Sequence, residues 1–437
     1  MKNLFLNLTC RAFNASKKFS FEGEIFFEMT EKKFAETIAE LGGTAYLVGG
    51  AVRDKFRGVE AHDKDYCVTG IEEKDFVVAL PKAVKVGKSF PVYNVRIDDV
   101  PCEVAFARKE WKSGLGYRGF KFTTDSSVTI EEDLFRRDTT INAIAVNLLT
   151  GEFTDPFNGR EDIFNKKIRA VSEHFSDDPV RALRAARQSA QFNFEICEET
   201  FERMKLCGEE LKLEPTERIF NELHAALKTD KPSIFFRNLE RAELLKTAFP
   251  EIERLRGKVQ PSAYHPEGDA YEHSLKILDD VAAVNENPCV RFAALVHDIG
   301  KGTTPAEMLP HHYFHEMRGG EVLKEMNARM ALPNDWKKTA AFVIKEHMRA
   351  PMITAAGKIT DFLIRLHNSK ISAKDFNDVI RADHGSLPPH LEKAEFLTEQ
   401  FLKVRGNNAP LPLKGYEVGE WVRRERIKIF VNLRNDL

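Results

Sequence analysis

The spacing of apolar residues changes partway along the chain, and this change limits the possible architectures more than any other feature. Up to about residue 165, helical stretches alternate with short strand-like runs at residues 46–48, 65–69, 93–97, 101–107 and 143–148. From Asp177 onward strand signals nearly vanish, and helical spacing prevails at residues 179–191, 217–227, 270–284 and 316–330. The pattern predicts an α/β head with a mixed sheet, followed by an all-helical neck, body and further domain.

The head has its highest density of candidate functional residues where an expected strand leads into Gly49-Gly50 and then into a helix. Backbone N–H groups at such a helix start can cradle a phosphate, and Arg53 in the first turn can bind a triphosphate bidentately. Asp63 and Asp65 are expected two residues apart on a strand, which would place both carboxylates on one face. Paired carboxylates beside a phosphate cradle suit Mg²⁺-dependent phosphoryl transfer. An ordinary surface turn is the alternative interpretation.

A second polar cluster occupies residues 132–142. Its Arg137 suits phosphate binding, since a guanidinium can donate two parallel hydrogen bonds to phosphate oxygens. Asp138 and Asn142 offer hydrogen bonds to a ribose or within a turn. A charged helix end would have the same composition.

A third cluster lies on a helix expected to begin at Pro179, with Ser176 or Asp177 as its cap. Charged side chains then recur every three residues and share one helix face, at Asp178, Arg181, Arg184 and Arg187. A carboxylate beside a guanidinium offers acceptors and donors to the Watson–Crick edge of a base. A solvated charged face would show the same spacing.

In this order, the three clusters resemble the class II, bacterial-type tRNA nucleotidyltransferases, the CCA-adding enzymes of the DNA polymerase beta superfamily. The resemblance runs from about Ala45 to beyond Asp383. It implies that Asp63 and Asp65 are the catalytic Mg²⁺ ligands, with Glu103 a weaker candidate for a third carboxylate. It also implies that the nucleotide is bound or selected, first CTP and then ATP, by Gly50, Arg53, Arg137, Asp178, Arg181, Arg184 and Arg187.

The chain departs from this family at two positions. Asp177 stands where the family usually has Glu, and its side chain is one methylene shorter, so its contact is expected to differ. Asn158 precedes Gly159 where the family often has two glycines; Asn tolerates the left-handed conformation that a glycine would adopt. Residues 108–119 resemble the flexible loop of the complete CCA-adding enzymes, although an ordinary surface loop is the alternative.

Histidine is distributed unevenly, with ten of the 13 between His265 and His390. The order of motifs there resembles an HD-superfamily phosphohydrolase, which implies a divalent metal site made of His273, His297, Asp298 and Asp383. Imidazole and carboxylate ligands suit Ni²⁺, Co²⁺, Mn²⁺ or Zn²⁺. The metal would activate water against a phosphate ester, and Lys301 could steady the phosphate. Additional candidates for a second shell or substrate contact are His311, His312, His315 and His347.

These patterns divide the 437 residues into six segments: an N-terminal extension at 1–30, the head at 31–165, the neck at 166–230, a body at 231–264, the HD domain at 265–390 and a helical tail at 391–437. The true start could be Met1 or Met29. Basic residues in the tail could form a patch for tRNA or a solvated helix face, at Arg423, Arg424, Arg426 and Lys428.

The charge and the cysteine content limit the possible binding partners and the cellular compartment of the protein. With 65 basic and 67 acidic residues the formal net charge is −2, so any surface for tRNA must be a local basic patch. No apolar run approaches the roughly 20 residues that span a bilayer, so no membrane is expected as a partner. The six cysteines form no CxxC pair, which favours a reducing cytoplasm over a disulfide framework.

We therefore expect an enzyme that adds CCA to tRNA from CTP and ATP, and that has phosphatase and 2′,3′-cyclic phosphodiesterase activity in the HD domain. Two alternatives remain: an A-adding enzyme or a poly(A) polymerase, which share the head and neck motifs, and an HD phosphohydrolase whose head docks RNA. The sequence leaves open whether the product is full CCA or only the terminal A. It also leaves open the HD metal, and whether the protein is a monomer or a homodimer.

Overall fold

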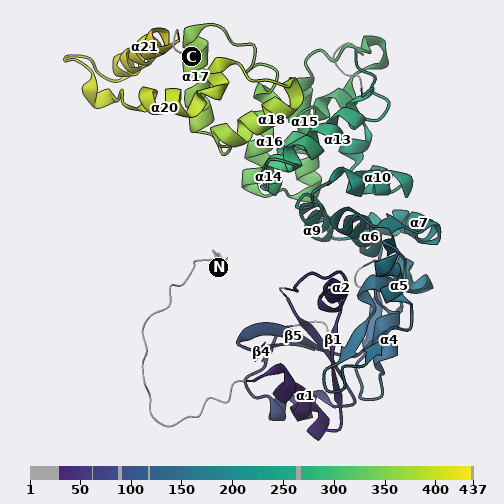
Figure 1. Ribbon diagram of the computed structural model, residues 1–437. Helices are drawn as coiled ribbons and strands as arrows, with labels where there is room; N and C mark the ends of the chain where they lie inside the picture. The colour runs from purple at the N-terminus through teal and green to yellow at the C-terminus, as the bar shows by residue number, and fades with distance from the viewer. Residues whose placement is uncertain (1–28, 62, 87–90, 117–118, 262–266, 435–437) are drawn as a thin grey trace, which may run out of the picture.

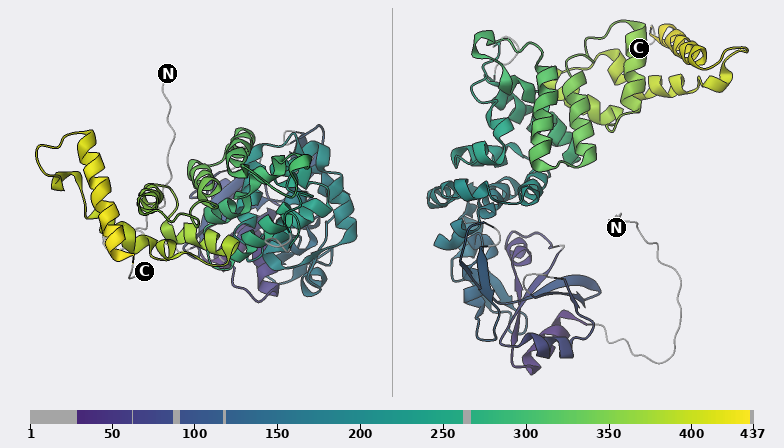
Figure 2. Two further views of the ribbon diagram at one scale, coloured as in Figure 1. Left: turned by 90° about the horizontal axis from the view of Figure 1, so that it is seen from above. Right: turned by 180° about the vertical axis from the view of Figure 1, so that it is seen from behind.

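The computed structural model describes residues 29–61, 63–86, 91–116, 119–261 and 267–434. This part of the chain forms an arc, with the head at one end, the neck helices in the middle and the remaining helices at the other end (Figure 1). The view from behind shows the same arc, from which the last helices project as an arm (Figure 2). Of the predicted N-terminal extension, residues 1–28 lie outside the described residues.

A seven-stranded sheet forms the head, in the order β3-β4-β5-β2-β1-β8-β9. Neighbouring strands are antiparallel except β2 and β5, which are parallel. The strands are β1 Thr44–Val48, β2 Asp65–Thr69, β3 Val84–Lys85, β4 Val92–Ile97, β5 Val100–Phe106, β8 Ala145–Asn147 and β9 Phe153–Thr154. The mixed sheet confirms the α/β head predicted from the alternating spacing.

The two faces of the sheet differ in chemistry because successive side chains on a strand point to opposite sides. On one face, Tyr66 and Val104 pack against Phe34 of helix α1 (Glu31–Glu40) in an apolar core. On the other face, Asp65 of β2 lies directly opposite Glu103 of β5 in the parallel register. The core thus fixes the strands so that two carboxylates stand side by side on the opposite face.

Helices dominate after the head, as predicted. The neck contains α6 Val180–Phe192, α7 Glu198–Lys205 and α9 Thr216–Ala226, and the body begins with α10 Ser233–Arg241. Then follow α13 Ala270–Ala282, α14 Pro288–Val296, the 3₁₀ turn η3 Ile299–Thr303, α15 His315–Met330, α16 Asn334–Glu346, α17 Ala356–His367 and α18 Ala373–His384. The arm carries α20 Ala394–Leu402 and α21 Tyr416–Leu433. One apolar core extends from the neck to Phe430, so the helical part is continuous. Among the described helices, none is long and apolar enough to cross a membrane.

Two features differ from the sequence expectation. The ends of the predicted loop at 108–119 continue into a hairpin of β6 (Lys109–Lys112) and β7 (Phe120–Thr123). Aromatic residues at alternating positions favour such a strand pair. A two-stranded parallel ladder, β10 (Lys167–Ile168) with β11 (Glu195–Ile196), also follows the head where only helices were expected.

Candidate active sites in the head and the HD domain

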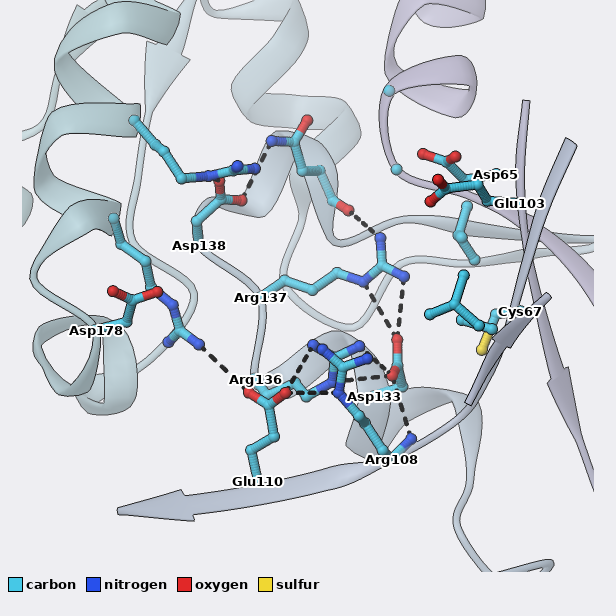
Figure 3. Close-up of a pocket in the computed structure, with 18 of the residues that line it drawn as sticks. Asp65, Cys67, Glu103, Arg108, Glu110, Asp133, Arg136, Arg137, Asp138 and Asp178 are labelled. Carbon is cyan, nitrogen blue, oxygen red and sulfur yellow. Dashed lines mark hydrogen bonds and ion pairs between the residues drawn. The ribbon is translucent and has the colours of Figure 1, made fainter. Parts of the chain in front are cut away.

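A pocket of about 930 Å³ opens between the head sheet and the neck helix α6 (Figure 3). It brings together nearly all residues predicted for the first site: Gly50, Arg53, Asp65, Glu103, Arg137, Asp178, Arg181, Arg184 and Arg187. Asp63 does not line this pocket; it is exposed in a bend before β2. The expectation that Asp63 and Asp65 share a strand is therefore wrong. Strand β1 ends at Val48, opposite Asp65, so the residues before Asp65 have no partner there.

The carboxylates at this site repel one another. Desolvation by the surrounding protein raises the pKa of Asp65, and the charges of Glu103 and Asp63 raise it further against the opposing effect of Arg137. Figure 3 shows the Asp65 and Glu103 carboxylates side by side at the sheet. A group of hard oxygen ligands that are held together against their own repulsion fits a divalent cation such as Mg²⁺.

The glycine turn lies against the same carboxylates. Gly49 has a φ of 70°, and a Cβ there would lie 3.3 Å from Arg137 Nη1 and 4.0 Å from Asp65 Oδ2. A side chain would therefore be strained and would intrude on the site. Helix α2 (Gly50–Phe56) begins at the next residue, as predicted. The Arg53 guanidinium donates to Asn142 Oδ1 at 2.7 Å and to Asp54, and it lies 4.3 Å from the Phe192 ring centroid.

A buried carboxylate holds two of the arginines. Asp133, only 1% exposed, accepts hydrogen bonds from Arg136 Nη2 at 2.6 Å and from Arg137 Nη2 at 3.0 Å. Burial alone would raise the pKa of Asp133, but the two guanidinium groups lower it to about 2. Asp133 therefore fixes the orientation of Arg137, which the resemblance assigns to nucleotide binding.

Asp133→Asn should reduce the stability of the protein at neutral pH. Removing one partner of a buried ion pair leaves uncompensated charge and costs about 3 kcal/mol. The pKa of Asp133 is lower in the folded protein than in the unfolded chain. The extra free energy of unfolding of the wild type over the variant should therefore be complete above about pH 4, and it should shrink as the pH falls toward 2. Guanidinium denaturation at pH 7 and pH 3 measures this difference. The exposed Glu131→Gln on the same helix is the matched control, and equal stability of both variants would contradict the expectation.

The neck helix begins one residue later than predicted and is capped differently. Asp178, not Ser176 or Asp177, accepts a hydrogen bond from the first-turn amide of Val180 at 3.2 Å. The Ser176 hydroxyl instead donates to the carbonyl of Arg203, and Asp177 pairs with the ring of His174. Both alternatives lie in a 3₁₀ turn before the helix, so their side chains point away from its first amides.

Asp178 does not form an ion pair with Arg181. Its Oδ2 accepts a hydrogen bond from Arg218 Nη2 of α9 at 2.7 Å. Arg181 donates from Nη1 to the backbone carbonyl of His174 at 2.7 Å and lies 3.8 Å from a carboxylate oxygen of Glu110. Both side chains still line the pocket, but each is held by a different neighbour rather than by the other.

The other two neck arginines are held by carboxylates as well. Arg184 donates to Asp138 Oδ2 at 2.8 Å, and Arg187 donates to Glu222 Oε2 at 2.6 Å. Burial alone would raise the pKa of Asp138, but Arg184 and two hydrogen bonds hold it well below the usual range. Asp138, 6% exposed, thus orients Arg184 from within the protein.

Four orienting residues were missed by the sequence reasoning or given another role: Asp133, Asp138, Arg218 and Glu222. Asp133 and Asp138 lie within the predicted cluster at 132–142, so a signal was present. Arg218 and Glu222 share one face of a predicted helix at i and i+4, which indicated only a charged helix face. Their partners are 40 and 35 residues away in sequence.

The second candidate site lies among the helices of the HD domain, where four histidine rings share one orientation. In each ring the Nδ1 atom faces an oxygen atom on the side away from the centre of the site. In His273 this oxygen belongs to the Glu267 carboxylate. In the other three rings it is a backbone carbonyl oxygen, at 2.7 Å for His297, 2.9 Å for His315 and 3.0 Å for His347. A carbonyl oxygen only accepts, so Nδ1 carries a proton in His297, His315 and His347. Outer hydrogen bonds of this kind orient metal-ligating histidines.

The inward nitrogens meet the predicted carboxylates. His273 Nε2 lies 3.1 Å from Asp383 Oδ1, and His297 Nε2 lies 3.2 Å from Asp298 Oδ2. Burial alone would lower the pKa of His297, but Asp298 and Asp383 raise it to about 10. Within the described residues, His297 Nε2 and Asp298 Oδ1 are buried without a hydrogen-bond partner. Such unpartnered donor atoms around one centre fit a metal ion.

The other predicted residues of this domain divide into two groups. His315 and His347 lie at the centre, as does Lys301, whose Nζ is 2.5 Å from Asp298 Oδ2. His312 instead bonds to Thr304 and to a backbone carbonyl, and His311 is exposed and stacks on a tyrosine. His265 lies outside the described residues.

The basic residues of the tail are partly engaged. Arg423 donates to Asp361 at 2.8 Å and 2.9 Å, and Arg426 donates to two backbone carbonyls of α20 and its end. Lys428 pairs with Glu425 on the same helix. Only Arg424 shows no interaction within the described residues, so the helix presents few free cations.

Comparisons with known proteins agree with the division into a head, a neck and an HD domain. Three family models match the chain: the Poly A polymerase head domain at residues 45–169, the probable RNA and SrmB-binding site of polymerase A at 193–255, and the HD domain at 270–400. These define the class, a polymerase-type head and neck joined to an HD domain.

Two curated relatives identify the family. The Multifunctional CCA protein of Acinetobacter baumannii (strain ATCC 17978) is 38% identical over 408 residues, which cover 89% of this chain and 97% of the relative. The protein of the same name from Cupriavidus metallidurans is 43% identical over 311 residues, 69% of this chain and 74% of the relative. The chain belongs to the family of multifunctional CCA proteins, which confirms the resemblance noted in the sequence.

Solved structures support the fold. "The structure of CCA-adding enzyme apo form II" has a TM-score of 0.63 and 21% identity, covering 93% of this chain and 95% of that one. "Crystal structure of tRNA nucleotidyltransferase complexed with a primer tRNA and an incoming ATP analog" has a TM-score of 0.56 and 23% identity, covering 85% and 98%. The arrangement of head, neck and HD domain is therefore that of the CCA-adding enzymes.

Proposed function

We propose that the head adds C, C and A to the 3′ end of tRNA from CTP and ATP without a nucleic-acid template. The observation that carries this proposal is the single pocket in which the carboxylates of the sheet face the arginines of the neck helix. The printed names of the relatives favour this function over an A-adding enzyme or a poly(A) polymerase. The intact carboxylates and arginines of the pocket also oppose the alternative of a head that merely docks RNA.

Asp63 and Asp65 would hold Mg²⁺, with Glu103 as a third carboxylate beside them. A bound Mg²⁺ would supply positive charge where the tRNA 3′-hydroxyl meets the α-phosphorus of the nucleotide and pyrophosphate leaves. The donor set fits because its members are oxygens and because burial, and then repulsion among them, already raises the pKa of Asp65.

The arginines position the triphosphate. Arg53 is fixed by Asn142 and Asp54, and Arg137 is fixed by Asp133. Both therefore present their remaining N–H groups in a set direction before a nucleotide arrives, which reduces the cost of ordering them on binding. Gly49 and Gly50 let the backbone approach the phosphates beside them. Catalysis by such a site is mainly orientation and charge stabilisation.

Asp178 and Arg181 would read the base edge, and Arg184 and Arg187 would bind phosphate or support the helix. Separate partners hold Asp178 and Arg181, which leaves acceptors on one and donors on the other available to a base. The selection of CTP and then ATP would thus reside in protein side chains.

The HD domain would hydrolyse phosphate monoesters and 2′,3′-cyclic phosphates with a divalent transition metal. His273, His297, Asp298 and Asp383 would hold the ion, which would supply Lewis-acid activation of water and phosphate. Lys301, beside Asp298, would contribute a further positive charge toward the ester.

The natural partners would be tRNA, CTP and ATP in the cytoplasm, with the protein a monomer or a homodimer. The six segments predicted from the sequence remain our proposed domain division. They place the nucleotide-adding site and the phosphohydrolase site on separate domains.

Incorporation assays test both the activity and its selectivity. Purified protein incubated with tRNA that lacks CCA should extend it with CTP and ATP but not with UTP or GTP. Asp178→Ala or Arg181→Ala should blur this choice by roughly 5- to 150-fold, equal to 1–3 kcal/mol for a lost base-edge contact. Arg187→Ala should instead raise KM for CTP and ATP alike.

Asp178→Ala is a suitable variant because Arg218 retains Glu214 as a second partner. Extension with ATP alone on tRNA lacking CCA would contradict full CCA addition. Unchanged ratios among the four nucleotides in the Asp178 and Arg181 variants would assign base selection to other residues.

A further inference from the structure

An aromatic ring at the end of the neck helix contacts two arginines of the head. Phe192 is the last residue of α6, it is 7% exposed, and it belongs to the apolar core of the neck. The guanidinium carbon of Arg53 lies over this ring, 4.3 Å from its centroid, and that of Arg57 lies 4.4 Å from the same centroid. Both distances are within the range of a cation–π interaction. Two cations, one in α2 and one at its end, therefore pack on a single ring of the neck.

The contact lies where the head has more positive than negative charge. Asp54 accepts hydrogen bonds from Arg53 Nη2 and from Arg57 Nη1, both at 2.9 Å. Burial alone would raise the pKa of Asp54, but the hydrogen bonds and charges of the two arginines lower it. One carboxylate neutralises only one of two guanidinium groups. The face of an aromatic ring carries partial negative charge, so Phe192 suits the charge that remains.

Arg53 connects this ring to the nucleotide pocket. Arg53 lines the pocket, whereas Phe192 and Arg57 do not. Arg53 Nη1 donates to Asn142 Oδ1 at 2.7 Å. A Cβ on Gly50 would lie 3.4 Å from Arg53 Nη2, so the guanidinium also stands against the glycine turn. The Phe192 ring can therefore act on a bound nucleotide only through Arg53.

The hydrogen bonds and the ring restrict different movements of Arg53. The N–H groups of a guanidinium lie in its plane, so the bonds to Asn142 and Asp54 fix its rotation within that plane. The Phe192 ring lies beneath the guanidinium carbon and limits its displacement toward the neck. Without the ring, part of the ordering of Arg53 would have to occur when the triphosphate binds, and that ordering weakens affinity.

A neighbouring phenylalanine provides a comparison within the same core. Phe194 is also 7% exposed and belongs to the same apolar cluster, with its ring centroid 5.8 Å from that of Phe192. Within the described part of the chain, no guanidinium lies over the Phe194 ring. The two rings are thus equally buried, and only one of them contacts the arginines of the head. Burial of an apolar side chain does not by itself account for that contact.

We propose that Phe192 is a positioning residue for nucleotide binding, whose ring holds Arg53 in the direction in which it meets the triphosphate. The inference rests on the proposed nucleotide-adding function and deepens it. Helix α6 then serves the nucleotide at both ends, since Asp178 and Arg181 near its start would read the base edge. The triphosphate is common to all four nucleotides, so the ring affects the binding of each nucleotide alike and does not select among bases.

Steady-state addition to tRNA lacking CCA tests the proposal on the full chain. Phe192→Leu removes the aromatic ring and keeps an apolar side chain. It should raise KM for CTP and for ATP by roughly 2- to 13-fold, the range for ordering one long side chain on binding. The values of kcat and the ratios among the four nucleotides should stay near those of the wild type. Phe192→Tyr, which keeps the ring, should retain the wild-type KM. Phe194→Leu is the matched control and should also retain it.

Fluorinated phenylalanines at position 192 separate the charge of the ring from its packing. Fluorine withdraws electron density from the ring face and changes the volume of the side chain little, so the variants should fold like the wild type. The KM for CTP should rise in steps from the monofluorinated to the difluorinated and trifluorinated ring. A side chain that only fills space in the core would show no such trend. Circular dichroism confirms the fold of each protein.

Binding of inorganic tripolyphosphate, measured by calorimetry with Mg²⁺, provides a readout that does not require activity. Phe192→Leu should weaken this binding by the same factor as it raises KM for CTP, because both ligands present a triphosphate to Arg53. Phe194→Leu should bind tripolyphosphate like the wild type.

An unchanged KM in folded Phe192→Leu would overturn the proposal, as would an equal rise in Phe194→Leu or a KM that does not respond to fluorination. Nucleotide addition by the wild type, together with unchanged tripolyphosphate affinity in Phe192→Leu, would contradict the positioning role alone. A wild type that adds no nucleotide, but whose tripolyphosphate affinity depends on the ring at position 192, would contradict the proposed function and leave the positioning role standing.

Discussion

Asp65→Asn should lower nucleotide addition by at least about a thousandfold. The substitution removes one charged ligand of the proposed Mg²⁺ site. A cation held there would stabilise the transition state by several kcal/mol, and a loss of about 4 kcal/mol lowers the rate by three orders of magnitude. Asp63→Asn should have the same effect if Asp63 binds the cation from its bend before β2. Single-turnover addition of CTP to tRNA lacking CCA measures the loss.

The stability of Asp65→Asn should be unchanged or slightly higher. The pKa of Asp65 is raised in the folded protein, so its negative charge is unfavourable there and an uncharged amide removes repulsion with Glu103. Asp75→Asn, at an exposed carboxylate on the helix at residues 73–79 of the same head, is the matched control for a lost charge. More than about a tenth of wild-type addition in a folded Asp65→Asn protein would reject the assignment of this residue.

Replacing His297 and Asp298 together by alanine should abolish metal-dependent phosphatase activity and leave CCA addition largely intact. The pair would supply two of the four proposed metal ligands in the HD motif, and loss of the ion would remove Lewis-acid stabilisation equal to at least about a thousandfold in rate. The head lies at the other end of the arc (Figure 1). The pocket between it and the neck has its own set of charged residues.

Both activities are measured on the same preparation, with hydrolysis of a chromogenic phosphomonoester in Co²⁺ and with nucleotide addition in Mg²⁺. His311→Ala serves as the control within the domain, since this ring is exposed and stacks on a tyrosine. A folded double variant that loses both activities would show that the head depends on the HD centre, contrary to a division into independent sites.

The features that the sequence predicted well are local. The strand that ends in Gly49-Gly50, the helix after it and the helical stretches beyond Asp177 all follow from residue spacing over a few turns. The mixed sheet was predictable as a class, because strand-like runs alternate with helical ones in the head. The HD residues that the structure brings together, such as His273 with Asp383 and His297 with Asp298, were predicted because their motif and order resemble a known family.

Features that depend on contacts between distant segments were not predictable. The spacing of Asp178 and Arg181 indicated a pair on one face, yet Arg218, 40 residues away, takes the carboxylate. Competition among several arginines for one carboxylate is decided by the tertiary structure, which periodicity does not report. The role of Asp133 was hidden for the same reason: a charged residue near a helix end gives no sign that it will be buried.

The carboxylates that hold the pocket arginines have a consequence for how this chain can change over generations. Asp133 and Glu222 each hold an arginine that lines the pocket. If these arginines bind the nucleotide as proposed, a single substitution at either one would remove that contact and would also leave a buried or half-buried carboxylate without its partner. Altered nucleotide preference would thus require two coordinated replacements, one on each side of the pair. Because both replacements are needed together, the nucleotide preference of this enzyme should change only rarely through single substitutions.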